Sequence, residues 1–113
     1  MSTADTKEIL NIYAKIARQL TDEDGVTIGA HGKMGFGSTA LRVNGKIFAM
    51  VISGEQFVVK LPRYRVESLE SEGIGQKFDP GHGRLMKEWL SLRPGSEHSW
   101  LALSKEALDF VSG

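Results

Sequence analysis

Apolar residues in the first part of the chain recur at the spacing of one helix face. Between residues 5 and 20 they fall three and four positions apart, at Ile9, Ile12, Tyr13, Ile16 and Leu20. Asp5 is in position to cap this helix, and Glu8, three residues later, completes a capping box. The acidic segment 21–25, which ends in glycine, predicts a solvated turn after the helix. We therefore expect an N-terminal helix whose apolar face packs on the rest of the domain.

The pattern changes in the middle of the chain, where short apolar runs alternate with turn residues. The runs are residues 39–43, 46–52 and 56–61. The first two are joined by Asn44-Gly45, which predicts a hairpin because both residues tolerate the positive φ of a type I′ turn. The second and third are joined through Ser53-Gly54. Residues 47–52 are all apolar, which predicts a strand in the centre of the sheet, covered on each face.

A second helix is predicted after the strands. Pro62 suits the first turn of a helix over 63–72, with Tyr64, Val66 and Leu69 as its apolar positions and Gly73 as its end. Residues 75–84 then predict a loop around a brief extended piece at 77–78.

The segment 85–92 fits two structures. A helical stripe and a strand alternation both match its apolar residues, so periodicity alone leaves the two open. Ser96 can cap a closing helix whose apolar positions are Trp100, Leu103, Ala107, Phe110 and Val111. Together these elements predict one α+β domain over residues 1–113, with an antiparallel sheet of four to six strands and N-terminal, middle and C-terminal helices.

Composition narrows the classes of function. The 14 basic and 14 acidic side chains cancel and alternate along the chain, which disfavours nucleic acid as a partner. The chain has no cysteine, and therefore no thiolate nucleophile or thiolate metal site. Its N-terminus is polar and acidic, unlike a secretory signal, and no apolar stretch approaches the length of a membrane span. We expect a cytoplasmic protein with no membrane partner.

Two glycine-rich segments could form a site. The segment 29–37 carries Lys33 among four glycines, but Met34 stands where a phosphate-binding loop needs serine or threonine, and a strand pattern follows. The segment 79–84 displays His82 and Arg84 on a turn. If the fold brings Lys33, His82 and Arg84 together, they would bind an anion or form a small enzyme site.

The sequence carries no motif for metal binding or nucleophilic catalysis. The three histidines, at 31, 82 and 98, have no metal-ligand spacing, and no serine lies in a nucleophile elbow, so we expect no metal, no cofactor and no catalytic residue. Lys60, Arg63 and Arg65 form a basic group at a strand-to-helix junction, whose default state is solvated. Trp89 and Trp100 lie within apolar patterns, which is typical of core or interface residues.

Several stretches together resemble the TfoX/Sxy N-terminal domain family. Residues 33–37 and 40–50 are similar to its Met-Phe-Gly and Gly-Lys-Phe-Ala signature, although Gly35 separates Met34 from Phe36. Residues 78–89 and 100–111 are similar to a bacterial subgroup that consists of this domain alone. The resemblance spans about residues 9–111. It implies a YjbR-like α+β fold and favours a strand over residues 86–92. Longer members regulate natural competence and carry a second, C-terminal domain, for which this chain has no residues. We therefore expect no competence role, and the resemblance maps no catalytic residue onto this chain.

We therefore expect a non-catalytic binding or regulatory module that contacts a protein or a small ligand through a sheet face or the glycine loops. The alternative is the anion-binding protein or enzyme built on Lys33, His82 and Arg84. A homodimer through an exposed sheet or the tryptophan-bearing segment is a further expectation.

Overall fold

A computed structural model describes residues 6–28, 40–52, 56–79, 86–93 and 95–113 of the chain. The elements follow one another as α1 (Thr6–Leu20), β1 (Val26–Ile28), β2 (Leu41–Val43), β3 (Lys46–Ile52), β4 (Gln56–Lys60), α2 (Arg63–Ser71), β5 (Gly75–Phe78), β6 (Met86–Leu92), a 3₁₀ turn η1 (Glu97–Ser99) and α3 (Trp100–Ser112). This arrangement confirms the predicted class, an antiparallel sheet with N-terminal, middle and C-terminal helices.

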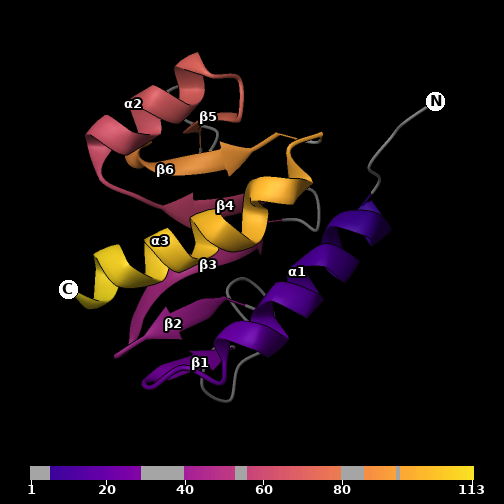
Figure 1. Ribbon diagram of the computed structural model, residues 1–113, viewed down its shortest axis with the longest axis vertical. Helices are drawn as coiled ribbons and strands as arrows, with labels where there is room; N and C mark the ends of the chain where they lie inside the picture. Colours follow the sequence, from indigo (N-terminus) through magenta and orange to yellow (C-terminus); the bar gives the residue numbers. More distant parts are fainter. Residues whose placement is uncertain (1–5, 29–39, 53–55, 80–85, 94) are drawn as a thin grey trace.

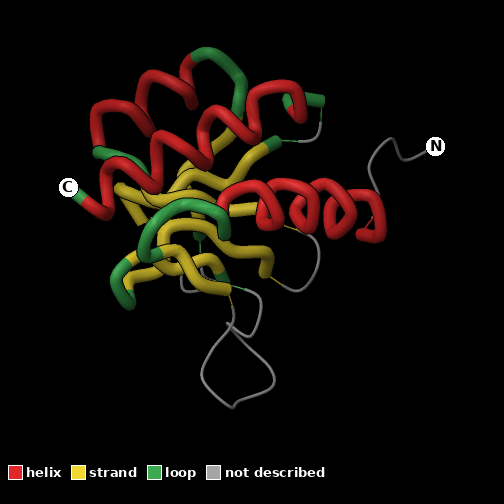
Figure 2. Tube along the Cα trace, turned by 60° about the horizontal axis from the view of Figure 1, so that its bottom comes forward, coloured by secondary structure: helices red, strands yellow, loops and turns green. Residues whose placement is uncertain are grey.

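The sheet has six strands in the order β1-β2-β3-β4-β6-β5, and every neighbouring pair is antiparallel. The three helices lie on the same face of this sheet (Figure 2). Figure 1 shows α3 crossing β3 and β4, with α1 beside it and α2 over β5 and β6. One hydrophobic core joins all three helices to the sheet.

The first helix and the first hairpin follow from the sequence pattern. Ile9, Tyr13, Ile16 and Leu20 are all buried, as the three-and-four spacing predicts. Asp5, the expected cap, lies outside the described residues. At the β2–β3 hairpin Asn44 has φ 53° and Gly45 has φ 84°, the pair of positive values that a type I′ turn requires.

Strand β3 is interior to the sheet, as predicted, but its burial does not alternate. Phe48 and Ala49 are successive residues and both are fully buried. The pairing explains this, since Arg42 pairs with Ile47 while Leu41 pairs with Ala49, which leaves Phe48 as an extra residue in the ladder. The other apolar residues of β3 are half-buried. The described helices cover one face only, so they do not supply the second cover that the sequence predicted.

The segment of ambiguous periodicity is a strand, β6, and it lies between β4 and β5. The loop predicted over residues 75–84 was partly wrong, because Gly75–Phe78 forms an edge strand longer than the expected two residues. Gly75 allows this strand to approach closely, since a Cβ atom at this position would lie 2.5 Å from the carbonyl oxygen of Ser91. Strand β6 thus bonds on both sides, to β4 and to β5.

Three aromatic rings form the centre of the core. Phe57 of β4 contacts Tyr13 and Trp100 edge-on, with ring centroids 5.2 and 5.1 Å apart. Burial raises the pKa of the Tyr13 hydroxyl, and a hydrogen bond from the backbone of Leu41 lowers it by less. The phenol of Tyr13 is therefore neutral, as a core position requires.

The indole of Trp100 is anchored by Ser96. Its Nε1 donates a hydrogen bond to Ser96 Oγ at 3.0 Å. The Ser96 hydroxyl is 2.6 Å from the carbonyl oxygen of Arg93 and 3.2 Å from that of Ile74. Ser96 precedes η1 without capping it through the side chain, so its role differs from the predicted helix cap.

Candidate functional site

The residues predicted to bind an anion, Lys33, His82 and Arg84, all lie outside the described residues, as do most residues of the two glycine-rich segments. The structure therefore does not test whether these three side chains converge, and the hypothesis stays a prediction.

The basic group at the β4–α2 junction is engaged within the fold. Arg65 makes a two-pronged ion pair with Glu106 of α3, through Nε and Nη2 at 2.9 Å each. The hydrogen bond to Glu106 raises the pKa of the Arg65 guanidinium, against a smaller opposing effect of burial. Arg63 pairs with Glu67 one turn along α2, at 3.3 Å. Because both guanidinium groups already have carboxylate partners, this group is a poor receptor for an external anion.

The third member of the group also has a partner. The Nζ atom of Lys60 lies 5.7 Å from the centroid of the Trp89 ring, within range of a cation–π contact. Trp89 pairs with Lys60 across the β4–β6 ladder and is half-buried, whereas Trp100 is almost fully buried in the core. The expectation of a core or interface role is thus confirmed for Trp100.

The Arg65–Glu106 pair is part of the lining of a groove between α2 and α3. This groove has a volume of about 300 Å³ and is lined by Pro62, Tyr64, Arg65, Glu106, Asp109 and Phe110. Tyr64 is 74% exposed and Phe110 is 36% exposed, so two aromatic side chains stand at the surface beside an ordered ion pair. We call it the α2–α3 groove.

The sequence analysis placed both aromatic residues among the apolar positions of their helices, but both side chains are exposed. Val66 and Leu69 define the buried side of α2, and Tyr64, two residues before Val66, lies on the opposite side of a helix of 3.6 residues per turn. Phe110 lies at the border of the stripe formed by Trp100, Leu103 and Ala107. The sequence already indicated that Tyr64 is exposed, because a helical-wheel projection of residues 63–71 separates Tyr64 from Val66 and Leu69.

A second hollow adjoins the groove and shares Asp109 with it. Its volume is about 310 Å³, and its lining is Asp22, Glu23, Asp24, Val43, Leu108, Asp109 and Ser112. The C-terminal ends of α1 and α3 both reach it, so the negative ends of two helix dipoles add to four carboxylates. We call it the acidic hollow.

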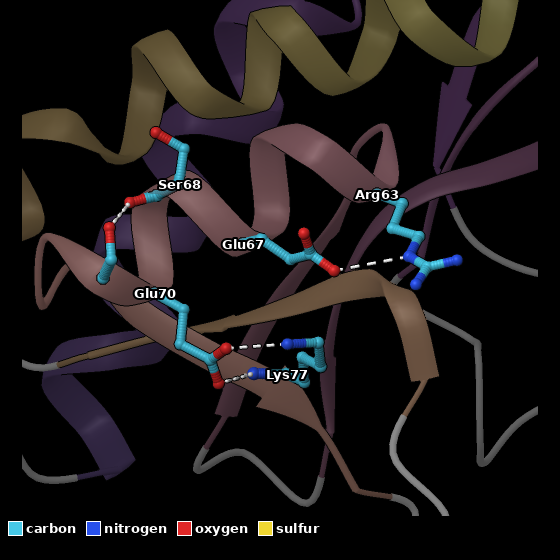
Figure 3. Close-up of polar contacts among 6 residues, drawn as sticks. Arg63, Glu67, Ser68, Glu70 and Lys77 are labelled. Carbon is cyan, nitrogen blue, oxygen red and sulfur yellow. Dashed lines mark hydrogen bonds and ion pairs between the residues drawn. The ribbon is translucent and has the colours of Figure 1, made fainter.

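Glu70 of α2 makes contacts with strand β5 that stabilise the fold. Glu70 receives two hydrogen bonds from Lys77 of β5, one from Nζ at 2.8 Å and one from the backbone N–H at 3.3 Å (Figure 3). These bonds lower the pKa of the Glu70 carboxyl. Figure 3 also shows Ser68 accepting a hydrogen bond from the side chain that follows it by three residues, Ser71. The Glu70–Lys77 contacts hold α2 against the edge strand β5, while the first turn of α2 lines the groove.

Among the described residues, no group of three or more histidine or carboxylate side chains is arranged to hold a metal ion. None of the described helices has both the length and the apolar character needed to cross a membrane.

Comparison of the chain with protein-family models, with curated proteins and with solved structures finds no match.

Proposed function

We propose that this chain is a non-catalytic binding or regulatory module that contacts a protein partner through the α2–α3 groove. The observation that carries the proposal is the exposure of Tyr64 and Phe110 in the same groove as the Arg65–Glu106 pair. Exposed aromatic residues around a rigid polar contact are the usual composition of the energetically dominant part of a protein interface.

The arginine in the groove already has a carboxylate partner, which supports a binding role over a catalytic one. The groove's guanidinium is committed to Glu106 by two hydrogen bonds, which holds the walls of the groove in a set geometry. A pre-formed surface binds with a smaller loss of side-chain entropy than one that must be ordered on contact.

The proposal includes a family and a location. We propose that the chain is a stand-alone member of the TfoX/Sxy N-terminal domain family that acts in the bacterial cytoplasm. The signature-like residues at 33–37 and 40–50 support this assignment, and so does the order of elements that the resemblance implies. The family assignment adds no catalytic residue, since fold and family alone do not supply function.

Photo-crosslinking at a single position tests the proposal. The photoreactive amino acid p-benzoylphenylalanine would replace Tyr64 in one variant and Leu10 in a matched control, because Leu10 is a surface residue of another helix and is 40% exposed. We expect irradiation in cells to give one dominant protein adduct at position 64 that is absent at position 10. The same adducts at both positions, or none at either, would refute the groove as an interface.

The alternative site on Lys33, His82 and Arg84 predicts a different result. A module that binds through the groove should keep its melting temperature when inorganic phosphate is added, whereas an anion-binding protein should be stabilised. If phosphate raises the melting temperature of the wild type and not of Arg84→Ala, the alternative is favoured.

A further inference from the structure

We infer that the partner presents a cationic peptide segment, with an apolar side chain in the α2–α3 groove and a lysine or arginine over the acidic hollow. This inference rests on the proposed function and names the chemistry of its partner. The two hollows lie on either side of the last turns of α3 and share Asp109, so one bound segment that passes over Asp109 could contact both the aromatic and the acidic lining.

The aromatic end provides the anchor. Tyr64 and Phe110 flank Pro62 in a hollow large enough for one side chain of leucine or phenylalanine size. The positive charges at this end, on Arg63 and Arg65, are each paired with a carboxylate. The groove therefore offers an incoming segment apolar contact and no unpaired arginine, and the unpaired carboxylate in its lining is Asp109.

The acidic end fixes the sign of the partner's charge. Asp22, Glu23, Asp24 and Asp109 line the hollow, and none of them forms an ion pair with a described cation. Two lysines are neighbours of lining residues, since Lys46 pairs with Val43 and Lys105 is one turn before Asp109 on α3. Two cations against four carboxylates leave an excess of two negative charges.

This concentration of negative charge stands out because the whole chain is neutral. Carboxylates at the C-terminal ends of two helices oppose the helix dipoles, so the arrangement is unfavourable for the isolated fold. A bound cation would relieve both repulsions together, which is the charge complementarity that assigns a basic segment to this surface.

A phage-displayed library of random 12-residue peptides, panned on the purified chain, tests the inference. We expect the selected peptides to carry net positive charge and at least one large apolar residue. Synthetic copies should bind the Tyr64→Ala variant about tenfold more weakly, as is typical of a central interface residue. The Asp109→Asn variant should weaken them by about two- to fivefold, the usual range for one exposed ion pair.

Charge-reversed copies of the selected peptides, with each lysine or arginine replaced by glutamate, are the matched control and should not bind. Selected peptides without an excess of positive charge, or binding unchanged in Asp109→Asn, would overturn the inference. A dimer in light scattering that Tyr64→Ala dissociates would also overturn it, because the groove would then belong to a second copy of the chain.

The outcomes separate this inference from the function on which it depends. If a partner is crosslinked at position 64 but the contacting segment is neutral or acidic, the module stands and the cationic segment is wrong. If no partner is crosslinked there, the proposed function itself fails.

Discussion

Replacing Ser96 with alanine would remove the hydrogen-bond acceptor of the indole N–H of Trp100, a large side chain buried in the core. Trp100 is 1% exposed, and its indole N–H donates to Ser96 Oγ at 3.0 Å. Alanine keeps the backbone and nearly the same volume, so the change removes the hydroxyl alone. The indole N–H would then be buried without a described acceptor.

The expected loss of stability in Ser96→Ala depends on which groups lose their only hydrogen-bond partner. The carbonyl oxygen of Arg93 also accepts from the backbone N–H of Ser96, and that of Ile74 also accepts from the backbone N–H of Arg93. Both carbonyls therefore stay bonded in Ser96→Ala. Only the indole N–H is left unsatisfied, which costs about 1–3 kcal/mol. For a chain of this length the melting temperature should fall by roughly 4 °C for each kcal/mol.

Urea unfolding followed by circular dichroism measures the effect, and a double-mutant cycle assigns it. Trp100→Phe removes the donor, so the Ser96→Ala change should cost about 1 kcal/mol less in the Trp100→Phe background than in the wild type. Ser71→Ala is the matched control, because this serine is exposed on α2 and its loss should change stability by less than about 0.5 kcal/mol.

Two results would refute the reasoning. If Ser96→Ala and Ser71→Ala are equally stable, the Trp100 hydrogen bond contributes nothing measurable. If Ser96→Ala costs the same with and without the indole N–H, the loss comes from some other contact of the hydroxyl.

Further predictions concern the core, the sheet and one ion pair. Phe57→Ala, which removes the central ring of the aromatic stack, should cost about 3–5 kcal/mol in urea unfolding, and a cost below about 1 kcal/mol would contradict the packing. Gly75→Ala should cost about 1–3 kcal/mol by thermal unfolding, because its Cβ would meet a backbone carbonyl at 2.5 Å. Gly73→Ala, with φ of 81° but open space around it, isolates backbone strain and should cost about 1 kcal/mol. An equal loss in both glycine variants would argue against the clash.

The pH dependence of the Glu70–Lys77 pair belongs to the same group. The folded-state pKa of Glu70 lies below its ordinary value of 4.5, so the pair stabilises the fold above pH 4.5 and this contribution is lost as the pH falls through the folded pKa. The difference in melting temperature between wild type and Glu70→Gln should therefore be largest near neutral pH and shrink below pH 4.5. A difference that is constant over this range would show that Glu70 acts through packing alone.

Local patterns predicted the elements of this fold well. Helix α1, the Asn44-Gly45 turn and the interior position of β3 all follow from interactions between residues close in sequence. The position of β6 between β4 and β5 does not, because its pairing with β4 joins residues about thirty positions apart in the sequence. The bulge that leaves Phe48 as an extra residue in β3 was not predicted for a similar reason, since a bulge is defined by the pairing with the partner strand.

The groove was harder to predict than the fold. Tyr64 and Phe110 are ordinary members of two helices, and they line one groove only because the first turn of α2 lies beside the last turns of α3. The Arg65–Glu106 pair joins residues 41 positions apart and has no local signature. The glycine-rich segments, where the sequence predicted an anion site, lie almost entirely outside the described residues, so that prediction stays open.

The place of β6 in the sheet has a consequence for synthesis on the ribosome. Strands β1 to β4 emerge first and pair with one another in the order of their synthesis. One edge of β4 stays unpaired until residues 86–92 have been synthesised. During that interval the backbone of Val58, Val59 and Lys60 offers open hydrogen-bonding groups to any other nascent chain. A premature stop before residue 86 would therefore release a fragment prone to self-association.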